Sequence, residues 1–373
     1  MIHKGAVTVE NGVIRAVDNA GESDALPREC TQIELGDVTL LPGLIDTHVH
    51  LGFDGGPDPV TLMRRSTDAQ QVLLMLRNAE HMLQAGVTTV RDLGTRDFLG
   101  SEVKNRIESG AATGPRLLTA GPPITSVGGH CWFMGGECSD VQSMTDAVRL
   151  RHKRGVDVIK IMVTGGFVTR TTAPAAAQFS RTELSAVVET AHDLGLRVAG
   201  HAHGTEGITM AVEAGTDTIE HCTWVGYQGL EFDPQVAELM AGNGTYVCPT
   251  VNRNARNPAG RIDWRQRSQH LAAMHAAGVP LLAGTDAGIE NIPHHAYASG
   301  LEIMTDIGMS LRDILVAATV RAAAALGISH LTGSISSGLA ADLLGVRGDP
   351  LVDLAALQRP VFVMAGGRTV PLP

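Results

Sequence analysis

The stretch Leu41-Pro42-Gly43-Leu44-Ile45-Asp46-Thr47-His48-Val49-His50-Leu51 is an apolar run that ends in two histidines separated by one residue. Pro42-Gly43 is a turn signal, and the apolar run after it is typical of a buried strand. Alternate side chains of a strand point to the same face, so His48 and His50 project together. Neutral imidazole is the commonest metal ligand of proteins, and this spacing is what two ligands of one metal ion require.

The composition favours a large α/β protein. The chain has 373 residues, of which 44% are hydrophobic and only 3% are aromatic, so small and aliphatic side chains must fill the interior. Such an interior is typical of a parallel sheet that is buried on both faces. With only 18% charged residues, the composition excludes a disordered chain.

Charge, cysteine content and hydropathy exclude several classes of protein. The formal net charge is −10 and the basic cluster Arg151-His152-Lys153-Arg154 is short, so we expect no nucleic-acid partner. The five scattered cysteines, without a C-x-x-C pair, predict reduced thiols. The N-terminal residues lack the apolar segment of a signal peptide, and no run of about 18 apolar residues predicts a membrane span. We therefore expect a cytoplasmic protein without membrane contact.

Both ends of the chain predict β structure. Asn11-Gly12, the strongest short hairpin signal, joins two runs of alternating hydrophobicity. The segments read as strands are 6–17, 31–35, 341–346 and 361–370. Neither end has enough apolar residues for a core of its own. We therefore predict that residues 1–42 and 340–373 together form one small β-sandwich domain.

Residues 43–339 alternate between strand-like and helix-like segments, which is the pattern of a parallel sheet covered by helices. Eight strand candidates are present, and eight strands close a (β/α)8 TIM barrel. The strand candidates are 44–50, 86–91, 116–121, 156–163, 196–202, 216–221, 244–249 and 279–285. The helix candidates are 61–84, 141–154, 181–194, 205–214, 231–241, 296–307 and 310–326. The exposed helices of such barrels often join copies of the chain, so we expect a homo-oligomer.

Polar residues stand near the carboxyl ends of five predicted strands, where barrels of this kind build their active sites. These residues are His48 and His50, Lys160, His201 and His203, Glu220 and His221, and Asp286. An isolated lysine in an apolar strand usually forms an ion pair or reaches to solvent, and an isolated histidine is usually a satisfied core residue. The argument for a site therefore depends on the whole set.

Several motifs carry a resemblance to a known family. They are Asp46-Thr47-His48-Val49-His50, Val158-Ile159-Lys160-Ile161-Met162, His201-Ala202-His203-Gly204, Ile219-Glu220-His221-Cys222 and Gly284-Thr285-Asp286-Ala287. With these motifs the chain resembles the amidohydrolase superfamily of metal-dependent hydrolases along nearly its whole length. Met162-Val163-Thr164-Gly165-Gly166 is most similar to the branch of dipeptidases and N-acyl-amino-acid hydrolases, which includes prolidase-like and ochratoxinase-like enzymes. Imidazolonepropionase is a more distant relative.

The resemblance implies a centre of two divalent metal ions, with Zn²⁺ as the expected metal, although manganese, cobalt or iron could take its place. Six residues would hold them: His48, His50 and Asp286 on one ion, His201 and His221 on the other, and Lys160 between both. Lys160 would be a carbamate formed with carbon dioxide, since an ammonium group beside two cations is unfavourable. The ions would lower the pKa of a bridging water, and the resulting hydroxide would attack a carbonyl. Asp286 would pass the proton to the leaving nitrogen.

The resemblance also suggests roles for residues around the metal centre. His130, after the third strand, would stabilise the oxyanion. His203 stands where related enzymes often have a tyrosine, and it either contacts a substrate carboxylate or fills space. Tyr227 and His294 are expected to line the pocket.

Three functional hypotheses remain open at this point. The first is hydrolysis of dipeptides or N-acyl amino acids that carry a free carboxylate, with ochratoxin-like amides included. The second is ring opening of a cyclic amide or lactone, as in imidazolonepropionase. The third is a barrel that binds or assembles without catalysis. A cationic anchor beyond the metal ions would favour the first hypothesis, a closed neutral slot would favour the second, and lost ligands would favour the third.

Overall fold

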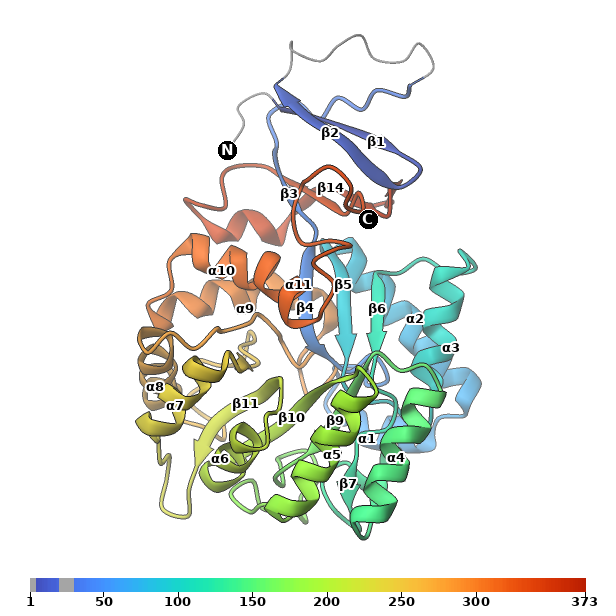
Figure 1. Cartoon of the computed structure of the whole chain (residues 1–373). Helices are drawn as coiled ribbons and strands as arrows, with labels where there is room; N and C mark the ends of the chain where they lie inside the picture. The colour runs from blue at the N-terminus through green and yellow to red at the C-terminus, as the bar shows by residue number, and fades with distance from the viewer. Residues whose placement is uncertain (1–4, 20–29) are drawn as a thin grey trace.

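The computed structural model describes residues 5–19 and 30–373, and it shows an α/β fold with strands from both chain ends at one pole (Figure 1). The strands are β1 Gly5–Glu10, β2 Val13–Asn19, β3 Thr39–Pro42, β4 Leu44–Val49, β5 Val87–Asp92, β6 Arg116–Thr119, β7 Thr125–Ser126, β8 Glu137–Cys138, β9 Val158–Met162, β10 Arg197–Gly204, β11 Thr218–Val225, β12 Tyr246–Cys248, β13 Leu343–Val346, β14 Pro360–Ala365 and β15 Arg368–Thr369.

Helices surround the central strands (Figure 1). The α-helices are α1 Pro59–Arg65, α2 Asp68–Gln84, α3 Leu99–Glu108, α4 Val141–Lys153, α5 Arg181–Asp193, α6 Thr205–Glu213, α7 Pro234–Asn243, α8 Trp264–Ala276, α9 Tyr297–Ile303, α10 Leu311–Ala317 and α11 Val320–Ala325. The 3-10 helices are η1 Trp132–Met134, η2 His294–Ala296, η3 Met304–Ile307 and η4 Leu354–Gln358. Among the described residues, no helix combines the length and the hydropathy needed to cross a membrane.

The central strands are parallel and join in a closed order. β4, β5 and β6 form one sheet, and β9, β10, β11 and β12 form a second. Ile124, which follows β6, forms a parallel bridge with Ile161 of β9. Leu281 forms a bridge with Val247 of β12, and Ala287 forms one with Val49 of β4, so the segment between them connects these two strands. Every residue of β4, β5 and β9 is buried, as in a parallel sheet covered on both faces. The (β/α)8 barrel itself stays a prediction.

The eighth predicted strand, 279–285, is not a regular strand. Leu281 forms an isolated bridge. The next two residues make hydrogen bonds to the strands on either side: Leu282 N–H donates to Val247 O of β12 at 2.8 Å, and Ala283 O accepts from Thr47 N–H of β4 at 3.2 Å. Pro280 cannot donate a backbone hydrogen bond, which limits the length of the ladder. The segment still carries the chain to Asp286 at the same edge as the other strands.

Two of the predicted long helices are each two shorter helices in the structure. The range 61–84 is divided into α1 and α2, because Thr67 and Gln70 form a capping box that begins a new helix. The range 310–326 is divided into α10 and α11 at Thr319, whose φ of −139° and ψ of −94° are not helical. The strand predicted at 31–35 is also wrong, since these mostly exposed residues form no ladder.

The two chain ends pair with each other. β3 runs antiparallel to β13, with Leu41 opposite Leu344, and β13 pairs with β14. The turn at Gly12, with a φ of 81°, lies so close to the turn at Gly366 that an added Cβ would come within 2.8 Å of the Gly366 carbonyl oxygen. Ile14 packs with residues of β13 and β14 in a small apolar cluster. The sandwich arrangement and the domain bounds 1–42 with 340–373 and 43–339 stay predictions.

Candidate metal and substrate site

The carboxyl ends of β4, β9, β10 and β11 meet in one buried region. His48 and His50 come from the end of β4, Lys160 from β9, His201 and His203 from β10, and His221 from β11. Asp286 follows the irregular eighth segment. His221 and Asp286 have left-handed φ values of 67° and 60°, a strained backbone that is common at functional positions. Residues that are far apart in the sequence thus lie side by side.

One group of atoms lies around the Asp286 carboxylate. Asp286 Oδ1 is 3.4 Å from His48 Nε2 and 3.3 Å from His50 Nε2, and Oδ2 is 3.9 Å from His221 Nδ1. His50 Nδ1 lies 3.3 Å from the Gly94 carbonyl oxygen, which can only accept, so its Nε2 keeps a lone pair. Asp286 Oδ1 and His48 Nε2 have no hydrogen-bond partner despite their burial. Facing lone pairs with no proton between them suit a divalent cation.

A second group consists of three imidazole rings. The ring centroids of His201 and His221 are 4.5 Å apart, and His203 lies 4.6 Å and 4.5 Å from them. The ligating atoms of these three residues lie within 4.8 Å of one another, so they are also suited to a metal ion. His130 stacks on His201 at 4.6 Å and is 2% exposed. The structure therefore brings His130 and His203 to the site, beside the six predicted ligands.

Lys160, on β9, lines the same cavity and has no hydrogen-bond partner for its Nζ atom. Its side chain is buried, and burial lowers the pKa of the ammonium group. A buried, unpaired ammonium group is costly, whereas an anion at this position would face imidazoles and metal ions. The environment therefore fits the carbamate that the resemblance implies.

Burial keeps His48, His201, His203 and His221 neutral and able to ligate. It lowers the pKa of His201, His203 and His221 well below 6.5, and that of His48 to about 4. Burial acts to raise the pKa of Asp286, but the interactions with His48, His50 and Lys160 outweigh it and lower the pKa of that carboxyl to about 2. Neutral imidazoles around an ionised carboxylate are the donor set that a divalent ion needs.

A cavity of about 530 Å³ opens from these residues. Its walls include His130, Cys131 and His203 near the proposed ligands, and an apolar part formed by Phe53, Phe167, Val168 and Ile289. Two arginines, Arg170 and Arg261, also line it. Arg261 donates to the Phe167 carbonyl oxygen at 3.1 Å, and its guanidinium lies 3.5 Å from Glu290. The cavity thus combines an apolar wall with a charged part, in which Asp58 and Glu290 stand beside the two arginines.

Two predicted pocket residues lie elsewhere. The Tyr227 side chain is 83% exposed and is not part of the cavity wall. His294 is buried behind the site, where its Nε2 lies 3.2 Å from the His50 carbonyl oxygen. Tyr227 thus faces solvent and His294 supports the backbone at the end of β4, while substrate contact by either residue stays a prediction.

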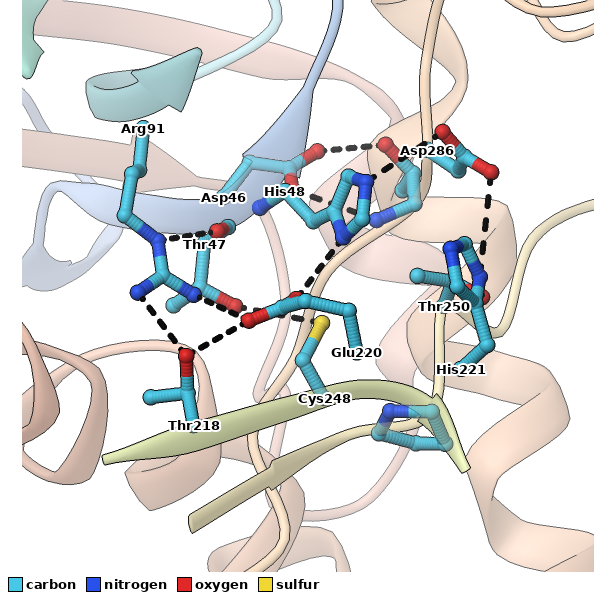
Figure 2. Close-up of polar contacts among 12 residues, drawn as sticks. Asp46, Thr47, His48, Arg91, Thr218, Glu220, His221, Cys248, Thr250 and Asp286 are labelled. Atoms are coloured by element: carbon cyan, nitrogen blue, oxygen red, sulfur yellow. Dashed lines mark hydrogen bonds and ion pairs between the residues drawn. The ribbon is translucent and has the colours of Figure 1, made fainter. Parts of the chain in front are cut away.

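Glu220 was predicted only to stand at a strand end, and Arg91 was not predicted to belong to the site; the two form a buried ion pair beside it (Figure 2). Arg91 Nη2 is 2.8 Å from Glu220 Oε1, and Glu220 Oε2 is 2.7 Å from His48 Nδ1. Burial acts to raise the pKa of Glu220, but Arg91 and His48 outweigh it and hold the pKa below its usual range. A charged residue inside an apolar strand was a signal that some partner existed, although its identity required the fold.

Comparison with known proteins gives consistent results. A family profile described as "Amidohydrolase family" matches residues 39–370. The chain is 28% identical to the ochratoxinase of Aspergillus niger, over 98% of this chain and 83% of that protein. It is similar to the crystal structure of a Xaa-Pro dipeptidase with bound methionine (TM-score 0.86, 30% identity, 97% of this chain and 94% of that one). It is also similar to a prolidase complexed with N-methylphosphonate-L-proline (TM-score 0.86, 26% identity, 99% and 95%).

Proposed function

Because this chain belongs to the amidohydrolase family and is a hydrolase of amide bonds, we propose that it cleaves dipeptides or N-acyl amino acids with a free carboxylate. The observation that carries this proposal is the shared cavity: the buried histidines and Asp286 open into a space that is also lined by Arg170 and Arg261. A scissile amide can therefore lie at the histidines while a carboxylate of the same molecule reaches a guanidinium. The relatives named above, a dipeptidase, a prolidase and ochratoxinase, support this substrate class.

The proposal includes two divalent ions, with Zn²⁺ expected from the nitrogen and oxygen donors. Their ligands would be His48, His50 and Asp286 on one ion, His201 and His221 on the other, and Lys160 as a carbamate between both. When bound, the two ions supply a water of lowered pKa and polarise the scissile carbonyl.

The residues of the chain would then orient the substrate and move the proton. Asp286, ionised at neutral pH, accepts the proton of the attacking water and delivers it to the leaving nitrogen. His130 lines the cavity and stacks on His201, and burial lowers its pKa to about 3. As a neutral imidazole it donates a hydrogen bond to the oxygen of the carbonyl under attack. The apolar wall around Phe53 and Ile289 accepts the side chain of the substrate.

The other two hypotheses fit the structure less well. A neutral slot, which a ring-opening hydrolase would favour, differs from a cavity lined by two arginines. The hypothesis of a barrel without catalysis requires that ligands are lost, but all six predicted ligands are present and buried.

We expect Arg261→Ala to raise KM for carboxylate substrates about tenfold with little change in kcat. A hydrogen bond to a charged group contributes roughly 1.5–3 kcal/mol when buried, and the lower end applies because the Arg261 side chain is 53% exposed. The measurement uses the best substrate from a library of dipeptides and N-acyl amino acids, and its C-terminal carboxamide. Turnover of the carboxamide should not respond to the substitution. Arg265→Ala, on exposed α8 nearby, is the matched control, and equal KM values in both variants would refute carboxylate recognition by Arg261.

A further inference from the structure

Glu220 is a buried carboxylate that touches the site without facing the cavity. We propose that Glu220 is a positioning residue that fixes the proton of His48 on Nδ1, so that the lone pair of Nε2 points at the metal position. This inference rests on the proposed metal centre. It adds to that centre a second residue of β11, the strand that also carries His221.

The contacts of Glu220 use both of its carboxylate oxygens. Oε2 lies 2.7 Å from His48 Nδ1, while Oε1 accepts from Arg91 Nη2 at 2.8 Å and from Thr218 Oγ1 at 2.6 Å (Figure 2). The side chains of Glu220 and His48 are both fully buried. Glu220 is therefore held from one side by a cation and a hydroxyl, and it presents its second oxygen to the imidazole.

These contacts determine the tautomer of His48. An ionised carboxylate only accepts hydrogen bonds, so the short contact to Oε2 requires a proton on His48 Nδ1. A neutral imidazole then has its lone pair on Nε2. That atom lies 3.4 Å from Asp286 Oδ1, and neither atom has a hydrogen-bond partner. The carboxylate thus leaves an acceptor, not a donor, on the side of the proposed ion.

The same network also fixes the backbone next to His48. Arg91 Nε donates to the Thr47 carbonyl oxygen at 2.7 Å and Arg91 Nη1 donates to Thr218 Oγ1 at 3.2 Å. Arg91 and Glu220 therefore hold both the main chain and the ring at the end of β4 (Figure 2). An ion pair that served only packing would not need the third contact to His48.

Glu220 is not itself placed as a ligand. Its potential ligand atom lies close to those of His48 and Cys248, which could suggest a separate metal site. Both of its oxygens are already bonded, however, and the Arg91 guanidinium would repel a cation there. A role in positioning His48 is consistent with the contacts of both Glu220 oxygens.

The test is Glu220→Gln, which keeps the size of the side chain but can offer a donor to His48. We expect the affinity for one of the two Zn²⁺ ions to fall about 10- to 100-fold, the usual effect of losing a residue that orients a ligand. Chelator competition gives the affinities, and the absorption spectrum of the Co²⁺-substituted protein should change. Asp157→Asn is the control, because Asp157 is a partly buried carboxylate that pairs with Lys104 away from the site. Unchanged Zn²⁺ affinities and Co²⁺ spectrum in Glu220→Gln would overturn the proposal.

A second measurement keeps the inference testable if Glu220→Gln does not fold. Long-range ¹H–¹⁵N NMR of the metal-free wild-type protein with labelled histidine should show His48 protonated on Nδ1. Protonation on Nε2 would overturn the inference. This result is independent of the proposed function, which fails separately if the wild-type protein binds no divalent ion.

Discussion

Replacement of Lys160 by alanine is expected to remove turnover and metal binding together. Lys160 is the ligand that the proposal places between the two ions, and its Nζ atom is buried without any hydrogen-bond partner. Without a bridging anion, the ions lose a shared ligand and the positive charge of the centre is no longer balanced. We expect kcat/KM to fall on the order of 10³-fold or more, the scale of losing an essential catalytic group. Metal content and steady-state kinetics measure both effects.

Small carboxylic acids should partly restore the activity of Lys160→Ala, because a free carboxylate can occupy the space of the missing carbamate. Lys153→Ala, at an exposed position of α4, is the control and should keep its metal and its activity. Full activity of Lys160→Ala without added acid would remove the bridge from this account.

Arg91→Met should have the largest effect on stability. The Arg91 and Glu220 side chains are 2% and 0% exposed and 2.8 Å apart, so loss of the guanidinium leaves a buried negative charge without its cation. Breaking such a pair from one side typically costs about 3–5 kcal/mol. In urea unfolding, the midpoint should fall while the dependence on denaturant stays the same.

The double substitution Arg91→Met with Glu220→Gln tests the cause of this loss. Because it removes both charges, it should recover part of the free energy of unfolding that the single substitution loses. A loss below about 1 kcal/mol for Arg91→Met alone would show that removal of Arg91 does not leave an uncompensated buried charge on Glu220.

The sequence predicted which residues converge at one edge better than it predicted the details of the fold. The H-x-H spacing at the end of an apolar run, with histidines, lysine and aspartate at later strand ends, was enough to predict that six residues converge. This worked because parallel strands place their carboxyl ends at one edge, whatever the loops between them do. The irregular segment before Asp286 shows the limit, since Pro280 cannot donate to the ladder and only an isolated bridge forms at Leu281.

Other features depend on contacts that a single sequence does not contain. The partner of Arg91 lies on a strand more than a hundred residues later, so only the fold identifies Glu220. Arg261 and Tyr227 are both loop residues, yet one lines the cavity and the other faces solvent, and no local pattern separates them. The break between α1 and α2 was visible as a capping box at Thr67 and Gln70, but the continuous amphipathic pattern obscured it.

The most direct test of the central claim is the metal content of the purified wild-type chain, measured together with hydrolysis of the substrate library. We predict about two divalent ions per chain, loss of turnover when a chelator removes them, and recovery when Zn²⁺ is restored. His201→Ala should lower the metal content in the same assay. A chain that hydrolyses these amides at full rate without bound metal would contradict the account.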